Sequence, residues 1–557
     1  MGKRFILICA SIVFLSGMVN AQDLLSGKVS GNFQIDAQVY KADSAIGAEE
    51  VSEKMLMNSF ANILYTQGSF NAGLRFESYL NPILGYDNRY KGTGVPYWFV
   101  SWQKEKFGIT VGNFYEQFGN GTILRSYEER NLGYDNAIKG VRVVFNPYRG
   151  IALKALVGTQ RFFWETGPGI VRGIDGEFAV NDIFDITNES IPRLTFGGSF
   201  VSKYETSSDI LVGDNGDQLL ILPENVAALS GRFNLNHKGF MLDGEYAYKY
   251  NDPSSVNNFI YKPGESLLLQ ASYSQKGFGV ILSGKRTDNM SFKSSRTESG
   301  NLLDINYLPA LTRQHAYALS AMYPYATQPN GEMAVQAQVN YKIKKGSLLG
   351  GKYGTDIAVN LSRITSIERT PINDSTALNE SGTLGYKSDF FAFGDELYFQ
   401  DFNIEIQHKF NSSFKALVSW VNLKYNIDVI EGDPGDPMVK ANIFIADATY
   451  KFDPRNAVKC ELQHLGTKQD DGDWAQALIE YTFSPTWFFT VMDQYNYGNE
   501  DSDKKFHYPT VALGYTQDSN RLSVSYGKQR KGIICVGGVC RTVPASNGLT
   551  ITLTSSF

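Results

Sequence analysis

The stretch Phe70–Glu77, which reads Phe-Asn-Ala-Gly-Leu-Arg-Phe-Glu, decides the fold. Its even-numbered residues are apolar, and its odd-numbered residues are polar, charged or glycine. Because successive side chains of a β-strand point to opposite faces, this stretch predicts a strand with one apolar and one ionic face. The same alternation recurs in Phe240–Lys249, Asp356–Ser362 and Arg521–Lys528. We therefore expect an all-β protein whose strands separate an apolar from a polar environment.

Composition narrows the protein class further. The chain has 43% hydrophobic, 13% aromatic and 20% charged residues, so it is expected to fold and bury apolar surface. Its net charge of -5 provides no basic footprint, and nucleic acid is not an expected partner. Past residue 21 the chain has no apolar run of about 18 residues, which excludes an α-helical membrane protein. A transmembrane β-barrel fits, because only every second strand residue faces lipid.

The first 21 residues have the pattern of a secretory signal peptide. Lys3 and Arg4 charge the start, Phe5–Met18 is apolar, and small residues end the segment at Ala21. The alternative is an uncleaved anchor helix, but the apolar stretch is shorter than the roughly 20 residues needed to span a membrane. We expect cleavage after Ala21 and one outer-membrane β-barrel domain over 22–557, in the cell outer membrane of a Gram-negative bacterium.

The spacing of the strand patterns predicts the barrel's size and connections. At roughly 21 to 23 residues per strand and connection, the chain after its leader gives about 24 strands, with a range of about 22 to 26. The fold class is therefore a transmembrane antiparallel up-and-down β-barrel with short periplasmic turns and long extracellular loops. The expected extracellular loops are the polar stretches 81–94, 205–224, 287–314, 365–396 and 426–438; the stretch 365–396 could also hide another strand pair.

The last residues favour the outer membrane. Leu549, Ile551 and Leu553 alternate with threonines, and Phe557 ends the chain in the same register. A terminal strand closing in an aromatic residue resembles the signal that outer-membrane barrels present to their assembly machinery. We expect that machinery to be a partner during biogenesis, and lipid and lipopolysaccharide to surround the folded barrel.

One polar segment, Phe114–Arg142, is the candidate for a constriction of the lumen. The strand pattern starts by about Lys28, so a plug is expected to come from a loop. This segment balances four acidic against four basic residues, which suits a lumen where each charge needs a partner because desolvation is costly. The alternative is a solvated extracellular loop. The candidate residues are Glu116, Arg125, Glu128, Glu129, Arg130, Asp135, Lys139 and Arg142.

Cys535 and Cys540 are predicted to form a disulfide. Gly537-Gly538 is a favoured two-residue hairpin turn, which places the two cysteines opposite each other as a non-hydrogen-bonded pair. Their Cα atoms would then be ~4.5 Å apart, at the short end of disulfide geometry. A position between the last two strands would lie outside the cell, where oxidation persists. The alternatives are free thiols or a metal site, which the lack of a nearby histidine disfavours.

Signals for catalysis are weak along the whole sequence. The five histidines are scattered without metal-ligand spacing, so we expect no enzyme activity, no catalytic residue, no metal and no cofactor. Gly346–Lys352 imitates a phosphate-binding loop, but Tyr353 replaces the required hydroxyl residue. It is expected to be a loop between strands.

Three segments resemble a known family. Gly112–Gly119, Tyr134–Asn136 and Cys535–Cys540, followed by Arg541 and Pro544, are similar to a large outer-membrane β-barrel family of Bacteroidota bacteria. The resemblance spans nearly the whole mature chain. It implies the location and the fold; the family has no assigned activity, so it implies no functional residue.

Two functions remain open on the sequence. The first is porin-like passage of hydrophilic solutes through a lumen narrowed by Phe114–Arg142. The second is a loop-plugged barrel that serves as a non-enzymatic accessory or scaffold subunit of an outer-membrane assembly, secretion or uptake complex, with lipoprotein or barrel partner subunits. A membrane-embedded hydrolase would need a nucleophile and base facing each other, and histidine is scarce.

Overall fold

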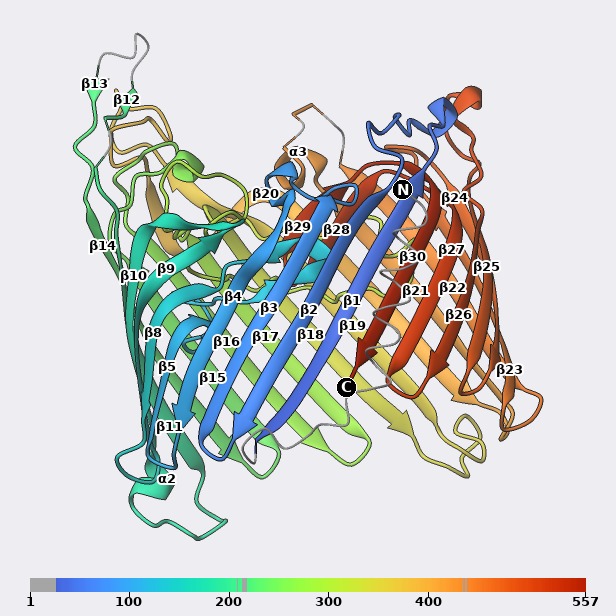
Figure 1. Ribbon diagram of the computed structural model, residues 1–557, viewed down its shortest axis with the longest axis horizontal. Helices are drawn as coiled ribbons and strands as arrows, with labels where there is room; N and C mark the ends of the chain where they lie inside the picture. Colours follow the sequence, from blue (N-terminus) through green and yellow to red (C-terminus); the bar gives the residue numbers. More distant parts are fainter. Residues whose placement is uncertain (1–26, 208, 213–217, 433, 436–437) are drawn as a thin grey trace.

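The computed structural model is a closed β-barrel (Figure 1). It describes residues 27–207, 209–212, 218–432, 434–435 and 438–557. The expected signal peptide, Met1–Ala21, lies outside the described residues. A single sheet of 24 strands forms the barrel, as the strand arithmetic predicted.

The barrel strands follow one another around the wall. The first twelve are β1 (Lys28–Tyr40), β2 (Leu56–Gln67), β3 (Phe70–Asn81), β4 (Gly92–Gln103), β5 (Phe107–Phe114), β8 (Ile138–Phe145), β9 (Ile151–Phe162), β10 (Glu165–Ala179), β11 (Arg193–Tyr204), β14 (Asn225–His237), β15 (Phe240–Lys249) and β16 (Gly264–Gln275). The remaining twelve are β17 (Phe278–Asp288), β18 (Gly331–Ile343), β19 (Thr355–Thr370), β20 (Lys387–Lys409), β21 (Phe414–Tyr425), β22 (Val439–Lys451), β23 (Asn456–Gly466), β24 (Trp474–Phe483), β25 (Trp487–Asn496), β26 (Thr510–Gln517), β27 (Asn520–Gln529) and β30 (Ser546–Ser556).

Antiparallel pairing of the first and last strands closes the barrel. Leu549 lies opposite Val39, Ile551 opposite Ala37 and Leu553 opposite Ile35. The backbone N–H of Phe557 donates to the carbonyl of Gly31, and the N–H of Gly31 donates back. Because every strand then has two neighbours, the sheet has no free edge along the wall.

The connections differ at the two ends of the barrel. At the turn end, where the short turns lie, the longest connections are 180–192, which contains helix α2 (Val180–Ile183), and 344–354. At the opposite, loop end, longer segments carry α3 (Ile427–Ile430) and three two-stranded ribbons. These ribbons are β6 (Glu128–Glu129) with β7 (Tyr134–Asp135), β12 (Leu211–Val212) with β13 (Gln218–Leu219), and β28 (Gly532–Val536) with β29 (Val539–Val543). None of the described helices is long and apolar enough to cross a membrane.

The stretch 365–396 is shorter as a loop than expected. Strand β19 continues to Thr370 and β20 begins at Lys387, so the two strands extend past their neighbours and only 371–386 connects them. The described part of this stretch contains no further strand pair. Register shifts beyond Ile364 accompany the extension, and such irregularities bend a strand pair away from the sheet.

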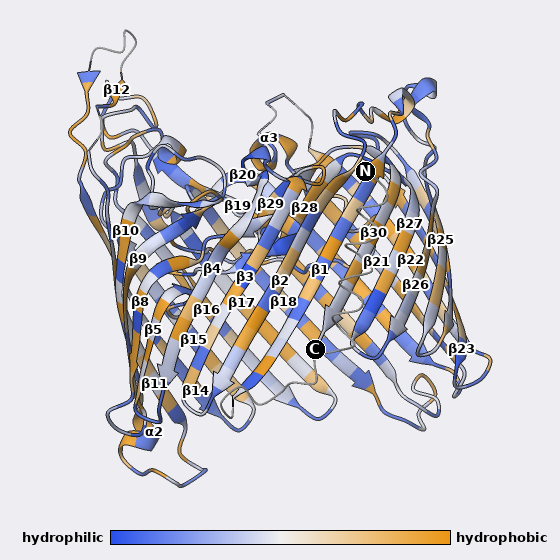
Figure 2. Ribbon diagram, viewed as in Figure 1, coloured by the Kyte–Doolittle hydropathy of each residue, from blue (hydrophilic) through white to orange (hydrophobic). Residues whose placement is uncertain are grey.

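Hydrophilic and hydrophobic residues alternate along many strands of the wall (Figure 2), and exposed large apolar side chains recur around it. Exposed large apolar side chains occupy alternate positions on most strands: Leu74 on β3, Trp98 on β4, Val111 on β5, Val157 on β9, Phe200 on β11, Leu229 on β14, Leu269 on β16, Leu282 on β17, Leu361 on β19, Val418 on β21, Phe444 on β22, Leu462 on β23, Ile479 on β24, Val491 on β25 and Leu513 on β26. Their neighbours in the chain face inward. Arg75, Glu245 and Asp401 are charged and buried inside the barrel.

Candidate functional site

Three segments from the loop end fold into the barrel and together form what we call the plug. The first plug segment, 115–137, connects β5 to β8; the second, 289–330, connects β17 to β18; and the disulfide hairpin, 532–543, lies between β27 and β30. The interior of the plug is apolar. Phe118, Ile123, Phe292 and Ile305 from the first two segments are at most 1% exposed and belong to one packed cluster.

The second plug segment corrects the expectation of an extracellular loop at 287–314. Its charged residues suggested solvent, but Lys293 and Arg296 are buried and paired. The Nε of Arg296 lies 3.0 Å from a carboxylate oxygen of Glu205, and Lys293 Nζ lies 2.5 Å from Asp304 Oδ1. Buried charges with partners, rather than solvated ones, account for the polar composition.

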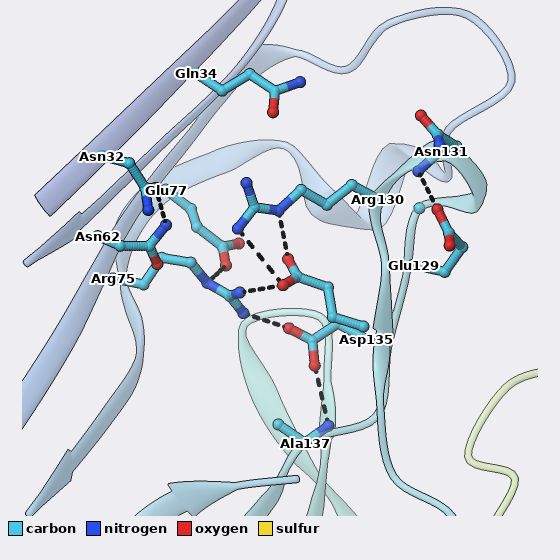
Figure 3. A network of polar contacts seen from close by, with 12 residues as sticks. Asn32, Gln34, Asn62, Arg75, Glu77, Glu129, Arg130, Asn131, Asp135 and Ala137 are labelled. Atoms are coloured by element: carbon cyan, nitrogen blue, oxygen red, sulfur yellow. Dashed lines mark hydrogen bonds and ion pairs between the residues drawn. The ribbon is translucent and has the colours of Figure 1, made fainter. Parts of the chain in front are cut away.

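A buried ionic network fixes the first plug segment to the wall (Figure 3). Three arginines meet three carboxylates in it: Arg75, Arg130 and Arg161 with Glu77, Glu128 and Asp135. Arg75 Nε lies 2.7 Å from Glu77 Oε1, and its Nη1 lies 2.8 Å from Glu128 Oε2. Arg161 Nη1 lies 2.7 Å from Asp135 Oδ2. Residues of β3 and β9 are thereby joined to the segment.

The same segment crosses the lumen to a strand on another part of the wall. The backbone N–H of Asn120 donates to Glu245 Oε2 at 2.7 Å, its side-chain amide donates at 3.0 Å, and the Thr122 hydroxyl donates to Glu245 Oε1. Glu245 belongs to β15, five positions around the sheet from β8. The first plug segment therefore spans part of the barrel's interior.

Most of the other charged candidates also have defined partners. Glu116 is paired with Arg142 at 2.6 Å and with Lys154 at 2.8 Å. The guanidinium of Arg125 lies over two tyrosine rings, 4.4 Å from the centre of Tyr127 and 4.0 Å from that of Tyr307. The Glu129 side chain accepts from the Asn131 backbone N–H at the start of a short 3-10 turn.

Lys139 is an exception, and its candidacy for the lumen is corrected. It is the second residue of β8, whose first residue, Ile138, is buried inside the barrel. Strand alternation then turns Lys139 to the exposed outer face, whereas Arg142 faces inward again.

The second plug segment also contacts the wall strands that follow β19. Arg313 Nη2 lies 2.7 Å from Glu405 Oε2, and His315 Nε2 lies 2.9 Å from Asp401 Oδ2, both on β20. Farther along, Tyr317 donates to Asp447 on β22, and the backbone N–H of Leu319 donates to Gln463 on β23. The segment is thus held by polar contacts with three strands of the wall.

Apolar packing on the loop-end side of the Asp447 contact was missed from the sequence. Val439, Ala441, Ile443 and Ile445 of β22 face inward and are at most 4% exposed, because Leu319 and Tyr323 of the plug belong to the same packed cluster. A strand facing water inside a barrel would be polar at these positions. Apolar residues on both faces of β22 were therefore the signal for a covered lumen.

The disulfide hairpin is held by its backbone carbonyls. Cys535 and Cys540 are bonded, with Cα atoms 4.1 Å apart, and are opposite each other in the hairpin. The Tyr307 hydroxyl donates to the carbonyl of Gly537 at 2.7 Å. Asn301 donates to the carbonyl of Cys540, and Gln314 to that of Cys535. The hairpin turns inward onto the second plug segment rather than outward into solvent.

The lumen at the turn end is polar. The residues that line a cavity of about 420 Å³ there include Asn340, Lys342, Asp356, Glu405 and Gln407 from β18 to β20, beside Phe278, Tyr341 and Ile357. Lys342 and Asp356 are paired at 2.7 Å and remain about half exposed. Because Glu405 also pairs with Arg313, this cavity directly adjoins the plug.

Burial shifts the pKa of several plug groups. It raises the pKa of the Asp304 carboxyl, and the nearby Lys293 ammonium partly offsets this effect. It also raises the pKa of the Tyr127 and Tyr134 hydroxyls; outside the plug, in the connection between β3 and β4, burial raises the pKa of Tyr86 to about 12. These phenols therefore stay neutral near pH 7; the Tyr86 hydroxyl donates to the carbonyl of Arg130, and the Tyr134 hydroxyl accepts from Asn136.

Comparisons with known proteins add the following. A model described as "Family of unknown function (DUF6029)" matches residues 1–557. The curated proteins include no match. Among solved structures, the P pilus usher (PapC) translocation pore is 10% identical, with a TM-score of 0.40 over 95% of this chain and 99% of that one. The siderophore receptor PirA from Pseudomonas aeruginosa is also 10% identical, with a TM-score of 0.40 over 95% of this chain and 80% of that one. The outer membrane protein OpdK from the same species is 9% identical, with a TM-score of 0.35 over 84% and 99%.

Proposed function

Because the chain belongs to a family of unknown function, DUF6029, we infer its function from its own geometry and propose an outer-membrane barrel that passes small hydrophilic solutes. In this proposal the plug narrows the lumen and solutes pass beside it or after its displacement. The signal peptide expected at Met1–Ala21 would export the chain, and no enzymatic step is involved.

The apolar outer belt supports a membrane location. Large apolar side chains such as Leu282, Phe444 and Leu462 are more than half exposed, and comparable residues recur on most strands. A contiguous exposed apolar surface of this extent is unfavourable in water. A hydrocarbon layer, with lipid and lipopolysaccharide as the surrounding partners, removes that cost.

The polar lumen at the turn end is the observation that carries the proposed passage. Barrels of about 16 to 18 strands already enclose an aqueous channel, so 24 strands enclose a wider one unless it is filled. The plug occupies the loop end, whereas exposed polar and charged side chains line the cavity at the turn end. A hydrophilic solute therefore finds partners along the inner wall, and the plug decides whether it enters.

A second candidate function is an accessory subunit with protein partners. It is favoured by the apolar extension of β20 beyond the wall, where Phe391 is 80% and Phe393 53% exposed. Ile221, on a neighbouring loop, is 86% exposed and its carbonyl accepts a hydrogen bond from Tyr261. A lipoprotein or a second barrel could cover these exposed apolar residues.

Conductance in a planar bilayer tests the proposed passage. Because β5 and β8 pair as far as Phe114 and Ile138, a short glycine-rich turn can replace residues 116–136 without stretching the wall. We expect small current steps from the unmodified protein and larger steps, with changed ion selectivity, from this variant. The matched control replaces 345–353, a loop at the turn end between the paired residues Ile343 and Thr355, and should conduct like the unmodified protein. If neither the unmodified protein nor the variant without residues 116–136 conducts ions, the result would favour the accessory-subunit function.

A further inference from the structure

We propose that the cavity where the three plug segments meet binds a neutral monosaccharide. The proposal rests on the proposed function, since it names the class of solute that the barrel recognises. The cavity has a volume of about 250 Å³ and lies among Tyr127 and Tyr134 of the first plug segment, Asp304 and Tyr307 of the second, and Gly538 of the disulfide hairpin. Pockets for drug-sized ligands measure about 300 to 1,000 Å³, so this one suits a smaller, single-ring ligand.

Three tyrosine rings are among the residues that line the cavity, and they are held in place. The Tyr127 ring centre is 4.9 Å from that of Tyr134 and 5.9 Å from that of Tyr307. The Tyr134 hydroxyl accepts from Asn136, and the Tyr307 hydroxyl donates to the Gly537 carbonyl. Fixed rings provide an apolar contact surface at a small cost in conformational entropy. The C–H face of a sugar ring matches such a surface.

Polar side chains also line the cavity. Asp304 remains 22% exposed while one of its oxygens pairs with Lys293. Asn301 also lines the cavity and uses its amide nitrogen to hold the Cys540 carbonyl, which leaves its oxygen to accept. Carboxylate and amide oxygens accept hydrogen bonds from hydroxyl groups. A ring with one apolar face and several hydroxyls at its edge can contact both kinds of lining residue.

Charge favours a neutral ligand over an ionic one. Of the cavity-lining residues that the structure describes, Asp304 is the one carboxylate, and Lys293 already neutralises it at 2.5 Å. Lys293 is buried and also donates to the carbonyls of Gly300 and Leu302. A charged ligand would lose its hydration, and the two cations near the cavity are already engaged, Lys293 by Asp304 and Arg125 by the rings of Tyr127 and Tyr307.

Occupancy of this cavity would stabilise the plug in its present arrangement. One ligand would touch all three plug segments, which come from different parts of the chain. A ligand that binds one arrangement more tightly shifts the population towards it. The sugar would therefore be recognised at the plug before passage.

Calorimetric titration of the full, folded chain tests this site. The detergent should be an amine oxide, because a sugar headgroup would compete. The probes are glucose, galactose, mannose and N-acetylglucosamine, compared with glucosamine and glucuronate, which carry charges on the same ring. We expect at least one neutral sugar to bind saturably, and the charged analogues to bind at least about tenfold more weakly.

Variants locate the binding. Tyr127→Ala and Asp304→Asn should each weaken the sugar affinity at least about tenfold, whereas Tyr127→Phe, which keeps the ring, should retain most of it. The matched control is Tyr148→Ala, at an exposed turn between β8 and β9. Absence of saturable binding by all four neutral sugars, tighter binding of a charged analogue, or unchanged affinity in Tyr127→Ala would overturn the proposal. Conductance without sugar binding would overturn this site alone; sugar binding without conductance would overturn the proposed passage alone.

Discussion

At the scale of the residue, the interior of this barrel is organised by paired charges. Arg75 and Arg161 are almost fully buried, and each contacts carboxylates from both the wall and the plug. Taking such charges out of water is costly, and only close opposite charges and hydrogen bonds compensate for it. The wall therefore provides a charged site that the first plug segment completes.

Asp135→Asn tests how strongly this network holds the plug. The change leaves Arg75 and Arg161 with one carboxylate fewer in a buried site, where breaking a pair costs about 3–5 kcal/mol. We expect faster amide hydrogen exchange over residues 115–137, with the wall strands unaffected. The matched control, Asp87→Asn, breaks an exposed pair with Arg89 and should cost at most about 1 kcal/mol. Similar exchange in both variants would mean that the network does not anchor the segment.

Acid should weaken an ion pair close to where the first and last strands close the barrel. Asp43 follows β1, and its carboxylate lies 2.7 Å from Lys528 Nζ on β27 and accepts from Asn547 on β30. The hydrogen bond from Lys528 lowers the pKa of Asp43 below its ordinary value of 3.8. The folded state therefore holds this proton less tightly, so the stabilisation is present above pH 3.8 and is lost as the pH falls through the lowered pKa.

Thermal unfolding of the Asp43→Asn variant checks this dependence. Its Tm should lie below that of the unmodified chain near pH 6, by the equivalent of about 1 kcal/mol or less. The difference should disappear at a pH below the lowered pKa of Asp43, where the unmodified carboxyl is also neutral. If the difference in Tm persists at the lower pH, its cause is the asparagine amide itself rather than the loss of the carboxylate's charge.

At the scale of the element, the sequence predicted the wall better than the site. Alternation of period two located the strands, and their spacing gave the number 24, because lipid and lumen impose opposite demands on alternate residues. The site depends on contacts that local patterns do not contain. The second plug segment was expected to be solvated because its charges, such as Arg296, are indistinguishable in sequence from surface charges. The inward apolar residues of β22 were its readable signal.

The disulfide hairpin is an element whose order should depend on its covalent bond. Closing a loop this short between Cys535 and Cys540 contributes about 2 kcal/mol in the chain-entropy model. In the Cys535→Ser, Cys540→Ser double variant we expect faster hydrogen exchange in 532–543 and in residues near Tyr307, which donates to the hairpin. Reductant should reproduce the effect in the unmodified chain and change nothing in the double variant. If hydrogen exchange becomes faster only within 532–543, the hairpin does not support the second plug segment.

At the scale of the whole molecule, the plug forms only where distant parts of the chain converge. The Tyr307–Gly537 hydrogen bond joins residues 230 positions apart, and the Asn120–Glu245 hydrogen bond joins residues 125 apart. Forming such contacts costs the chain little conformational entropy once the wall has closed and placed their partners nearby. The barrel thus acts as the scaffold on which three loops become one site, and the wall itself depends on the medium around it.

The Leu462→Arg variant tests whether lipid surrounds the wall. Leu462 is 61% exposed on β23, so in water the change would be almost neutral, whereas on a lipid-facing strand it costs about 2–4 kcal/mol near the bilayer midplane. We expect a smaller folded fraction in lipid vesicles, measured by the mobility of unheated samples on gels. The control, Leu348→Arg, changes a 99% exposed residue in the turn-end loop 344–354 and should fold like the unmodified chain. Equal folding of both variants would contradict a hydrocarbon layer around the apolar belt, and with it the membrane location on which solute passage depends.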